Sequence, residues 1–205
     1  MNVSPPQTVN HHADHPGFGG VTGLLFGVLF LAIGRAKARL AVDIASVSAT
    51  DRVIDIGCGP GVAVRAAARR GAHAIGVDPA PVMLRVARAV TRGSTKVEWA
   101  EGAAENLPVP TGSATVVWSL ATVHHWKDAT KGLSEVHRVL APGGRVLAIE
   151  RQVRPAATGV ASHGWTEQQV ESFASLCRTA GFDNVRVEGR GNGGGAVWAV
   201  RGVKP

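Results

Sequence analysis

The fold is decided by the stretch Val53-Ile54-Asp55-Ile56-Gly57-Cys58-Gly59-Pro60-Gly61. Its first four residues predict a short buried strand, and the three alternating glycines then predict a turn. Val62 to Arg70 follows with a helical composition. Glycine is used where the backbone takes positive φ or where a Cβ would collide with a ligand, and the first N–H groups of a helix are free to bind a polar group. The stretch therefore predicts a ligand site on bare backbone, at the carboxyl edge of an open α/β sheet.

The glycine spacing separates two classes of cofactor-binding turn. The dinucleotide fingerprint has its third glycine three residues after the second, whereas Gly57, Gly59 and Gly61 alternate. Asp55 stands inside the strand, where a carboxylate is costly to bury without a partner. The stretch resembles the first motif of the class I S-adenosylmethionine-dependent methyltransferases, in particular the small-molecule branch of methyltransferase type 11. The resemblance implies that Asp55 helps to hold the amino-acid end of S-adenosylmethionine, and the alternative is a tight turn that binds no ligand.

A second carboxylate is expected at the same edge. Ala72 to Val77 predicts an apolar strand that ends at Asp78-Pro79, 78 − 61 = 17 residues after the last glycine. The resemblance makes Asp78 the residue that accepts both ribose hydroxyls of the cofactor. The alternative is an N-cap role for Asp78 on a helix over 81–91. Met83, one turn into that helix, either packs on the adenosine or fills the core.

The motif that contacts the adenine departs from the family pattern. A strand is expected over 95–100, and 101–110 resembles the family stretch in which Gly-Asp-Ala-Glu precedes Leu-Pro. The family Asp contacts the adenine amino group, but the matching position here is Ala103. The hydrogen bond would have to come from the backbone, from Glu101 or Glu105, or be absent, which puts the affinity for the cofactor in question.

Two histidines follow the fourth strand. Ala114 to Leu120 reads as a buried strand that opens into Ala121-Thr122-Val123-His124-His125-Trp126. In the family this end of the strand faces the departing methyl group, where a histidine can take a proton from an attacking hydroxyl or amine. His125 is the first candidate for a catalytic base and His124 the second. Because neighbouring residues of an extended segment point opposite ways, only one of the two is expected to face the methyl group. The alternative is that both histidines only shape the pocket.

The remainder of the chain completes the family pattern. Glu135, Arg138, Val139, Leu140, Pro142, Gly143 and Gly144 reproduce E-x-x-R-V-L-x-P-G-G. Further elements are expected as helices over 131–140 and 165–181 and strands over 145–150, 182–188 and 196–201, with a capping box from Thr166 to Gln169. The resemblance then implies an α/β Rossmann-like class I methyltransferase fold: a seven-stranded, mostly parallel sheet in the order 3-2-1-4-5-7-6, the seventh strand antiparallel, with helices on both faces. The residues expected to bind the cofactor are Asp55, Gly57, Cys58, Gly59, Gly61, Asp78, Pro79, Met83, Ala103, Ala104 and Leu120.

Composition narrows the class of protein further. At 205 residues with 45% hydrophobic residues, the chain can bury a sizeable core. Two cysteines and eight histidines show no metal-ligand spacing, so no metal is expected. The net charge of +7 is compatible with nucleic acid or anionic lipid. The basic residues are scattered and the chain has no tyrosine, so a nucleic-acid partner is not favoured.

The amino-terminal region gives two alternatives. Residues 1–20 predict a mobile polar arm that contains His11, His12 and His15. Phe18 to Gly34 is apolar on every side and is interpreted as a lid over the active site or as an anchor that dips into a membrane. We expect residues 1–47 to form this arm and cap helix and 48–205 the methyltransferase domain. The expected location is the cytoplasm, or the inner face of the membrane with association through 18–34.

The sequence identifies the methyl donor better than it identifies the molecule that accepts the methyl group. A small, apolar acceptor (a metabolite, a lipid or a quinone-like molecule) is expected, since the Asn-Pro-Pro-aromatic and Pro-Cys motifs of other acceptor classes are absent. The alternatives are an RNA methyltransferase that uses the basic surface and a cofactor-binding module without turnover. The acceptor atom and the oligomeric state are left open.

Overall fold

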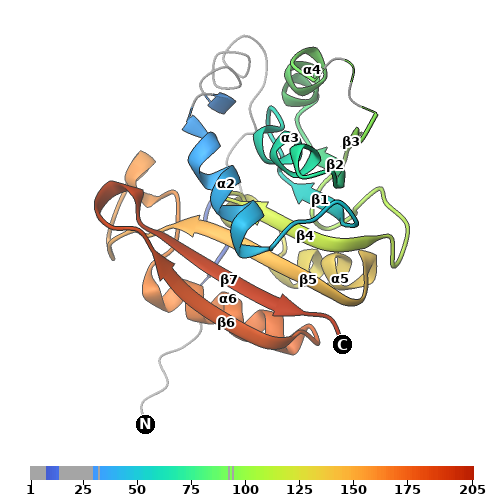
Figure 1. The fold of residues 1–205 in the computed structure, drawn as a ribbon. Coiled ribbons are helices and arrows are strands. Elements are labelled where there is room, and N and C mark those ends of the chain that lie inside the picture. The colour runs from blue at the N-terminus through green and yellow to red at the C-terminus, as the bar shows by residue number, and fades with distance from the viewer. Residues whose placement is uncertain (1–7, 14–29, 32, 92, 94) are drawn as a thin grey trace.

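The computed structural model describes residues 8–13, 30–31, 33–91, 93 and 95–205. Its strands are β1 (Arg52–Ile56), β2 (His73–Asp78), β3 (Val97–Glu101), β4 (Ala114–Leu120), β5 (Leu140–Arg151), β6 (Asp183–Arg190) and β7 (Val197–Val203). They form one sheet in the order β3-β2-β1-β4-β5-β7-β6 (Figure 1). β1 to β5 pair in parallel, and β7 is antiparallel to both β5 and β6. The expected strand order and the antiparallel seventh strand are confirmed.

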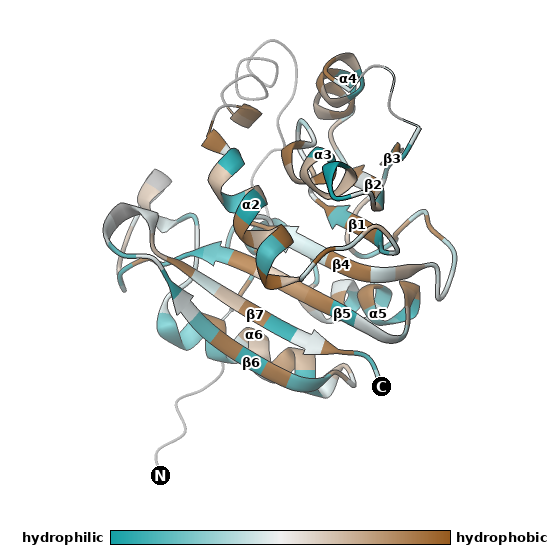
Figure 2. Cartoon of the chain, in the orientation of Figure 1, coloured by the Kyte–Doolittle hydropathy of each residue, from teal (hydrophilic) through white to brown (hydrophobic). Residues whose placement is uncertain are grey.

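Helices cover both faces of the sheet (Figure 1). The α-helices are α2 (Arg35–Ile44), α3 (Val62–Arg69), α4 (Pro81–Ala89), α5 (Ala129–Val139) and α6 (Glu167–Thr179), and the short 3-10 helices are η1 (Val123–His125), η2 (Gly159–Ser162) and η3 (Gly193–Gly195). One core packs α5 and α6 against the sheet, and a second packs α2 and α3 against the other face. Figure 2 shows why two cores form: apolar residues concentrate on the central strands, which must be covered on both sides.

Most expected elements agree with the structure to within a few residues. β4 has the expected bounds, and Thr166 and Gln169 form the expected capping box on α6. β5 begins at Leu140 rather than at Arg145. The reason is that the Pro-Gly-Gly segment stays extended beside the end of the chain, where Gly143 N donates to Lys204 O and Lys204 N donates to Gly144 O, each at 2.8 Å.

The prediction of a mobile amino-terminal arm is wrong for residues 8–13. Val9 is 3% exposed within the core that contains α5 and α6. Its carbonyl accepts a hydrogen bond of 2.8 Å from the indole of Trp165, and the amide of Asn10 donates to Trp126 O and Lys127 O. The polar residues of this segment predict a solvated arm. In the structure, polar groups of the segment instead form hydrogen bonds with groups far along the chain.

The apolar segment 18–34 lies mostly outside the described residues, which omit 14–29 and 32. Of its described part, Phe30, Leu31 and Ile33 are helical, and Ile33 is 62% exposed. Among the helices formed by described residues, none is long and apolar enough to cross a membrane. The choice between lid and anchor, and the division of the chain at residue 47, stay predictions.

Candidate active site

The glycine turn joins the carboxyl ends of β1 and β2. Gly57 N and Cys58 N both donate to Val77 O, at 2.8 and 3.1 Å. Gly57, Gly59 and Gly61 all have positive φ, at 70°, 52° and 75°. Such angles are strained for other residues, which accounts for the alternating pattern.

The three glycines face different surroundings. A Cβ on Gly57 would lie 2.7 Å from the side chain of Thr122, and one on Gly61 would lie 2.0 Å from the ring of Trp99. No described atom lies within 4 Å of a Cβ built on Gly59. Gly57 and Gly61 are therefore required by packing, whereas Gly59 leaves a bare, open surface on the ligand side of the turn.

Two buried carboxyl groups flank this surface. Asp78 accepts hydrogen bonds from Gly59 N and Ala80 N, both at 2.8 Å. Burial raises the pKa of Asp78, although these two donors oppose the rise. Burial and the charge of Asp78 raise the pKa of Asp55 well above its usual range. Two desolvated acids side by side favour a cationic or hydrogen-bond-donating ligand.

Asp78 does not cap the following helix in the expected way. α4 begins at Pro81 with Ala80 as its N-cap residue, and the side chain of this residue makes no capping hydrogen bond. Asp78 lies two residues before the N-cap and accepts from Ala80 N and Gly59 N. The carboxylate of Asp78 thus holds the glycine turn. This contact argues against the N-cap alternative for Asp78 and agrees with the expected position beside the open surface at Gly59.

The other expected cofactor residues lie along the same edge. Cys58 is buried, which raises the pKa of its thiol well above the usual range. Met83 is 2% exposed inside α4, so it fills the core in this structure. The remaining positions are exposed Pro79, half-buried Ala103 in a bridge with Asn106, buried Ala104, and half-buried Leu120 at the end of β4. Of the acids proposed to replace the adenine contact, Glu105 accepts a hydrogen bond from Asp128 N, and Glu101 is exposed.

The end of β4 carries a strained residue and then the two histidines. Ala121 has φ 61°, a conformation that non-glycine residues rarely adopt and that often marks functional sites. His124 is 2% exposed, and its Nδ1 lies 2.9 Å from Oε2 of Glu150, which is itself 0% exposed. The other oxygen of Glu150 accepts from Val123 N at 2.9 Å. This carboxylate, at the end of β5, therefore fixes both the turn and the imidazole.

His125 lies closer to the surface than His124. Its ring is half-buried, and its Nδ1 lies 3.4 Å from the carbonyl of His12. Burial, together with the charge of His124, lowers the pKa of His125 to about 4. His125 is consequently neutral at pH 7.

The expectation that only one of the two histidines faces the site is wrong. Residues 123–125 form the 3-10 helix η1 rather than an extended segment, so the rings do not point opposite ways. Their centroids are 4.1 Å apart. Both imidazoles therefore belong to one group.

Further histidines join this group from distant parts of the chain. His163, on the loop after η2, has its ring centroid 5.4 Å from those of both His124 and His125. His12 stacks on His163 at 4.3 Å and 17°. His11 binds the carbonyl and His12 the hydroxyl of Ser162 through Nε2, at 3.0 and 3.1 Å. Sequence reasoning did not place these residues together, because their only signal is histidine content and not spacing.

Lys37 of α2 is another residue whose position the sequence did not indicate. Burial lowers the pKa of its ammonium group, while the charge of Glu150 opposes this effect and that of Arg151 adds to it. The interaction with these two residues places Lys37 near the carboxyl end of β5. α2 thereby extends the positive charge toward the site.

The Glu135 and Arg138 motif holds the loop that follows β3. The two side chains are paired at 2.7 Å, and Glu135 also accepts from Leu107 N at 2.8 Å. Arg138 donates to the carbonyls of Leu107 and Val109. The motif therefore fixes the loop that follows Ala103 and Ala104, two of the residues expected to bind the cofactor.

Known proteins resemble this chain in sequence and in fold. The Methyltransferase domain family matches residues 54–148. A demethylmenaquinone methyltransferase of Clavibacter sepedonicus is 30% identical over 187 residues, which cover 77% of this chain and 75% of that protein. One of Thermus thermophilus is 39% identical over 116 residues, 55% of this chain and 52% of that protein. A crystal structure of a SAM dependent methyltransferase from Aquifex aeolicus aligns with a TM-score of 0.72 and 16% identity, covering 89% of this chain and 98% of that one.

The chain belongs to the class I S-adenosylmethionine-dependent methyltransferases. It is an enzyme of this class, and S-adenosylmethionine is its cofactor. The site suits this molecule, because a cationic, hydrogen-bond-donating ligand matches the two buried acids and a flat nucleoside matches the open surface at Gly59.

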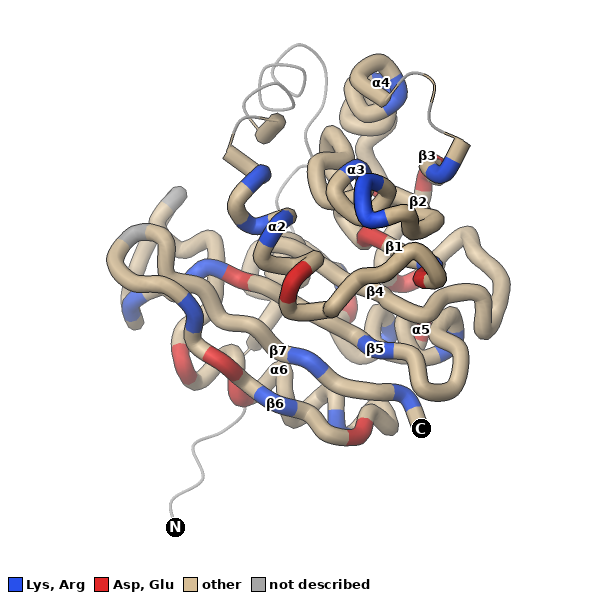
Figure 3. Tube along the Cα trace, in the orientation of Figure 1, with Lys and Arg blue, Asp and Glu red and all other residues tan. Residues whose placement is uncertain are grey.

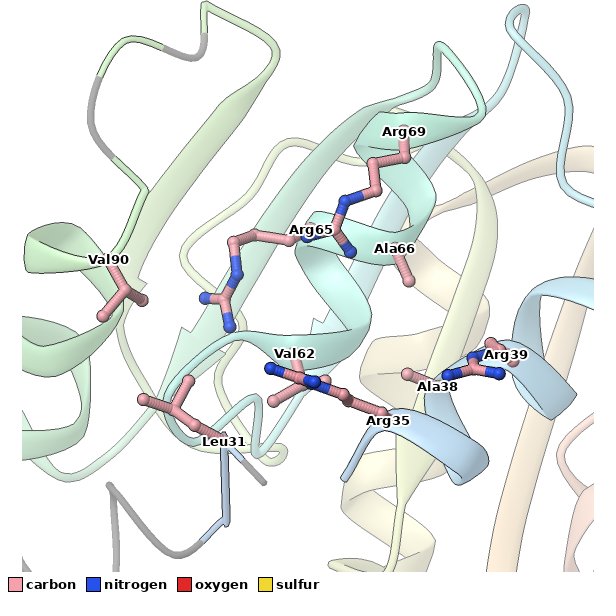
Figure 4. A pocket seen from close by; sticks show the side chains of 9 residues that line it. All are labelled: Leu31, Arg35, Ala38, Arg39, Val62, Arg65, Ala66, Arg69 and Val90. Carbon is pink, nitrogen blue, oxygen red and sulfur yellow. The ribbon is translucent and has the colours of Figure 1, made fainter. Parts of the chain in front are cut away.

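A hollow lies away from the open surface at Gly59. It has a volume of about 310 Å³ and lies between α2, α3 and Val90, and it is lined by Arg35, Arg39, Arg65 and Arg69 among apolar side chains (Figure 4). Figure 3 shows the same concentration of positive charge on α2 and α3. Burial and the charges of Arg69 and Arg35 lower the pKa of Arg65. The hollow therefore favours an anionic group.

Proposed function

We propose that the chain methylates a small, apolar, quinone-like acceptor. Two relatives are named demethylmenaquinone methyltransferases, and one of them aligns over three quarters of its length. The observation that carries the proposal is the shared edge: the open surface at Gly59 and the histidines after β4 both lie at the carboxyl ends of neighbouring strands. An acceptor held at the histidines would meet the methyl group of a cofactor held at the glycine turn.

We assign the cofactor to residues around the turn. Asp55 would hold its ammonium group, the backbone at Gly59 would lie against it, and Asp78 would accept the ribose hydroxyls. Asp78 would exchange its present bond to Gly59 N, or share it, when the ribose arrives. The cofactor supplies an activated methyl group when bound, so the protein needs mainly to position the acceptor and exclude water.

The histidines provide a base that can take the proton from the acceptor's hydroxyl group. A quinol carbon or oxygen becomes a good nucleophile when its hydroxyl group loses a proton, and a neutral imidazole within reach can accept it. His125 is neutral at pH 7 and half-buried, so it can meet a ligand, whereas His124 is enclosed and held by Glu150. The proposal therefore keeps His125 as the residue that contacts the acceptor.

His125→Ala tests this assignment. We expect kcat for a naphthoquinol acceptor to fall at least tenfold, because a general base contributes about 10² to 10⁴ in rate, while the Kd for S-adenosylmethionine stays unchanged. The loss should be smallest at high pH, where the acceptor ionises unaided. Release of S-adenosylhomocysteine is measured with a metal chelator present, and His73→Ala, an exposed histidine at the opposite edge, serves as control. Unchanged turnover across pH would make His125 a pocket wall.

RNA is the second candidate acceptor, and the arginine-lined hollow is the observation that favours it. Contacts to phosphates would make binding fall steeply with salt. Retention of RNA that is lost in Arg35→Gln and Arg69→Gln, followed by methyl transfer to that RNA, would support this alternative. A chain that binds the cofactor but methylates neither quinols nor RNA would support the binding module without turnover.

The location of the enzyme follows from the acceptor. A quinone-like acceptor is dissolved in lipid, so we propose a cytoplasmic enzyme that works at the inner face of the membrane. The exposed Ile33 at the end of segment 18–34 is consistent with this. Flotation with liposomes that survives high salt and requires residues 18–34 would support the anchor, and an enzyme that does not float would support the lid.

A further inference from the structure

The strongest unassigned feature is the group of three histidines, His124, His125 and His163. Each offers a ring nitrogen, and the three nitrogens lie within 4.8 Å of one another. The rings come from two loops, one after β4 and one after β5, which meet at the same edge of the sheet. We propose that these three side chains bind one divalent transition-metal ion of the zinc type.

The donor set suits such an ion. Neutral imidazole nitrogens are preferred ligands of Zn²⁺, Co²⁺, Ni²⁺ and Cu²⁺, and three histidines with one open position are a known catalytic arrangement for zinc. In a tetrahedral site with Zn–N bonds of about 2.0–2.1 Å, the ligand nitrogens are about 3.3–3.5 Å apart. The nitrogens of the present group lie within 4.8 Å of one another, so the ion would draw the rings together by at most about 1.5 Å.

His124 carries the independent evidence for a ligand. Its Nε2 is buried and has no hydrogen-bond partner among the described residues. A buried polar atom without a partner is costly and calls for an explanation. Its Nδ1 lies 2.9 Å from the carboxylate of Glu150, to which it donates as N–H, so that Nε2 carries the lone pair that an ion would bind.

The surroundings match the outer shell of metal sites. A metal-ligating histidine usually donates its other ring N–H to a carboxylate or a backbone carbonyl. Glu150 serves His124 in this way, and the carbonyl of His12 lies 3.4 Å from Nδ1 of His125.

The third ligand is held in place by the backbone. Arg151 Nε donates to His163 O at 3.1 Å, which ties the loop to the end of β5. Gly164 follows with φ 148°, and a Cβ there would lie 2.3 Å from Arg151 O. The loop can approach the strand this closely only with glycine at that position.

The metal site goes beyond the proposed function and does not depend on it. Only the catalytic role of the ion rests on the proposed function, because that role assumes an acceptor with a hydroxyl group. An ion with an open fourth position would bind the acceptor's hydroxyl oxygen and lower the pKa of that hydroxyl. His125 would then act as a ligand and not as a base. The expectation from sequence that no metal is needed rests on spacing alone, and spacing is uninformative where the ligands lie 163 − 125 = 38 residues apart.

The test uses the tag-free full chain, stripped with a chelator, and Zn²⁺ or Co²⁺ alone at neutral pH. We expect one Zn²⁺ per chain by calorimetry, and a Co²⁺ absorption spectrum of a four- or five-coordinate nitrogen site. His163→Gln and His125→Gln should each weaken binding at least tenfold, and Glu150→Gln by about 10- to 100-fold. His73→Gln should bind as the wild type does. His163 lies in a surface loop, so its variant should keep the wild-type unfolding temperature without metal.

Two results would overturn the inference. One is the absence of stoichiometric binding. The other is binding that His163→Gln and His125→Gln retain, as expected if the amino-terminal histidines or the cysteines held the ion; a thiolate charge-transfer band of Co²⁺ would identify the cysteines. Affinity for S-adenosylhomocysteine is measured in parallel. A chain that binds this molecule but no ion would keep the proposed function and lose only the metal site.

Discussion

At the scale of single residues, three glycines with positive φ have different surroundings. Gly57 and Gly61 avoid contacts with Thr122 and Trp99, whereas no described atom lies within 4 Å of a Cβ built on Gly59. The alternation of glycines in the sequence predicts the turn, but only the three-dimensional contacts separate the packing residues from the ligand-facing one.

Asp78 provides the first test at this scale. Asp78→Ala removes the acceptor for Gly59 N and for the expected ribose hydroxyls, so binding of S-adenosylhomocysteine should weaken by about 1–3 kcal/mol. Calorimetric titration measures this change. Asp78→Asn, which keeps the size and one acceptor oxygen, should lose less, and exposed Asp43→Ala should lose nothing. Wild-type affinity in Asp78→Ala would place the ribose elsewhere.

Residues also show where sequence reasoning stops. Asp55, Asp78 and the glycines could be predicted because each stands at a fixed distance from a strand end. His163 and His12 could not, because their approach to His124 depends on where two loops and the amino terminus come to lie. Ala103 leaves the adenine contact without a predicted acidic partner, and the structure places only half-buried Glu105 and exposed Glu101 nearby in the chain.

At the scale of elements, strands and helices could be predicted from hydrophobic periodicity, and the amino-terminal segment could not. β1 and β2 are short, mainly apolar runs that end at Gly57 and at Asp78, and β4 is a continuous apolar run, which are local signals. Residues 8–13 are mostly polar, and their hydrogen bonds reach Trp126, Ser162 and Trp165, more than a hundred positions away. No local pattern encodes such contacts.

The buried amino-terminal segment gives a prediction of stability. Val9→Ala should lower the free energy of unfolding by about 1–2 kcal/mol, because it removes methyl groups from the core beside α6. Urea denaturation measures the change. Thr8→Ala is the matched control, since that side chain is exposed and only its carbonyl is used, by Gln169. Equal midpoints for both variants would restore the interpretation of residues 8–13 as a mobile arm.

At the scale of the whole molecule, chemistry and stability occupy opposite edges of the sheet. The carboxyl edge gathers buried acids and a group of histidines, whereas the amino edge is closed by an ion pair with several further hydrogen bonds. There Arg145 donates to both oxygens of Asp51, at 3.1 and 2.8 Å, and Thr115 and Ser48 add further hydrogen bonds. Burial alone would raise the pKa of Asp51, but these donors outweigh it and lower the pKa to about 2.

This pair predicts the response to acid. Because the pKa of Asp51 is lower in the folded state than its ordinary 3.8, its contribution to stability is present above about pH 4 and is lost as the pH falls toward 2. Asp51→Asn should cost about 1–2 kcal/mol at pH 7, a value reduced for the partial exposure of Arg145. The difference from the wild type should close near pH 2 in urea unfolding. If the difference in the free energy of unfolding between the wild type and Asp51→Asn did not change with pH, the charge of Asp51 would not be the cause of that difference.

The central claim is that the open surface at Gly59 is where the cofactor of this methyltransferase binds. Calorimetric titration of S-adenosylhomocysteine into wild type, Gly59→Val and Gly112→Val tests it most directly. Gly112 is a fair control because it also has positive φ, at 65°, and no described atom within 4 Å of its Cβ position, but it lies before β4 at the opposite edge. We predict one site per chain in the wild type and in Gly112→Val, and no binding in a folded Gly59→Val. Equal binding by all three proteins would contradict the account.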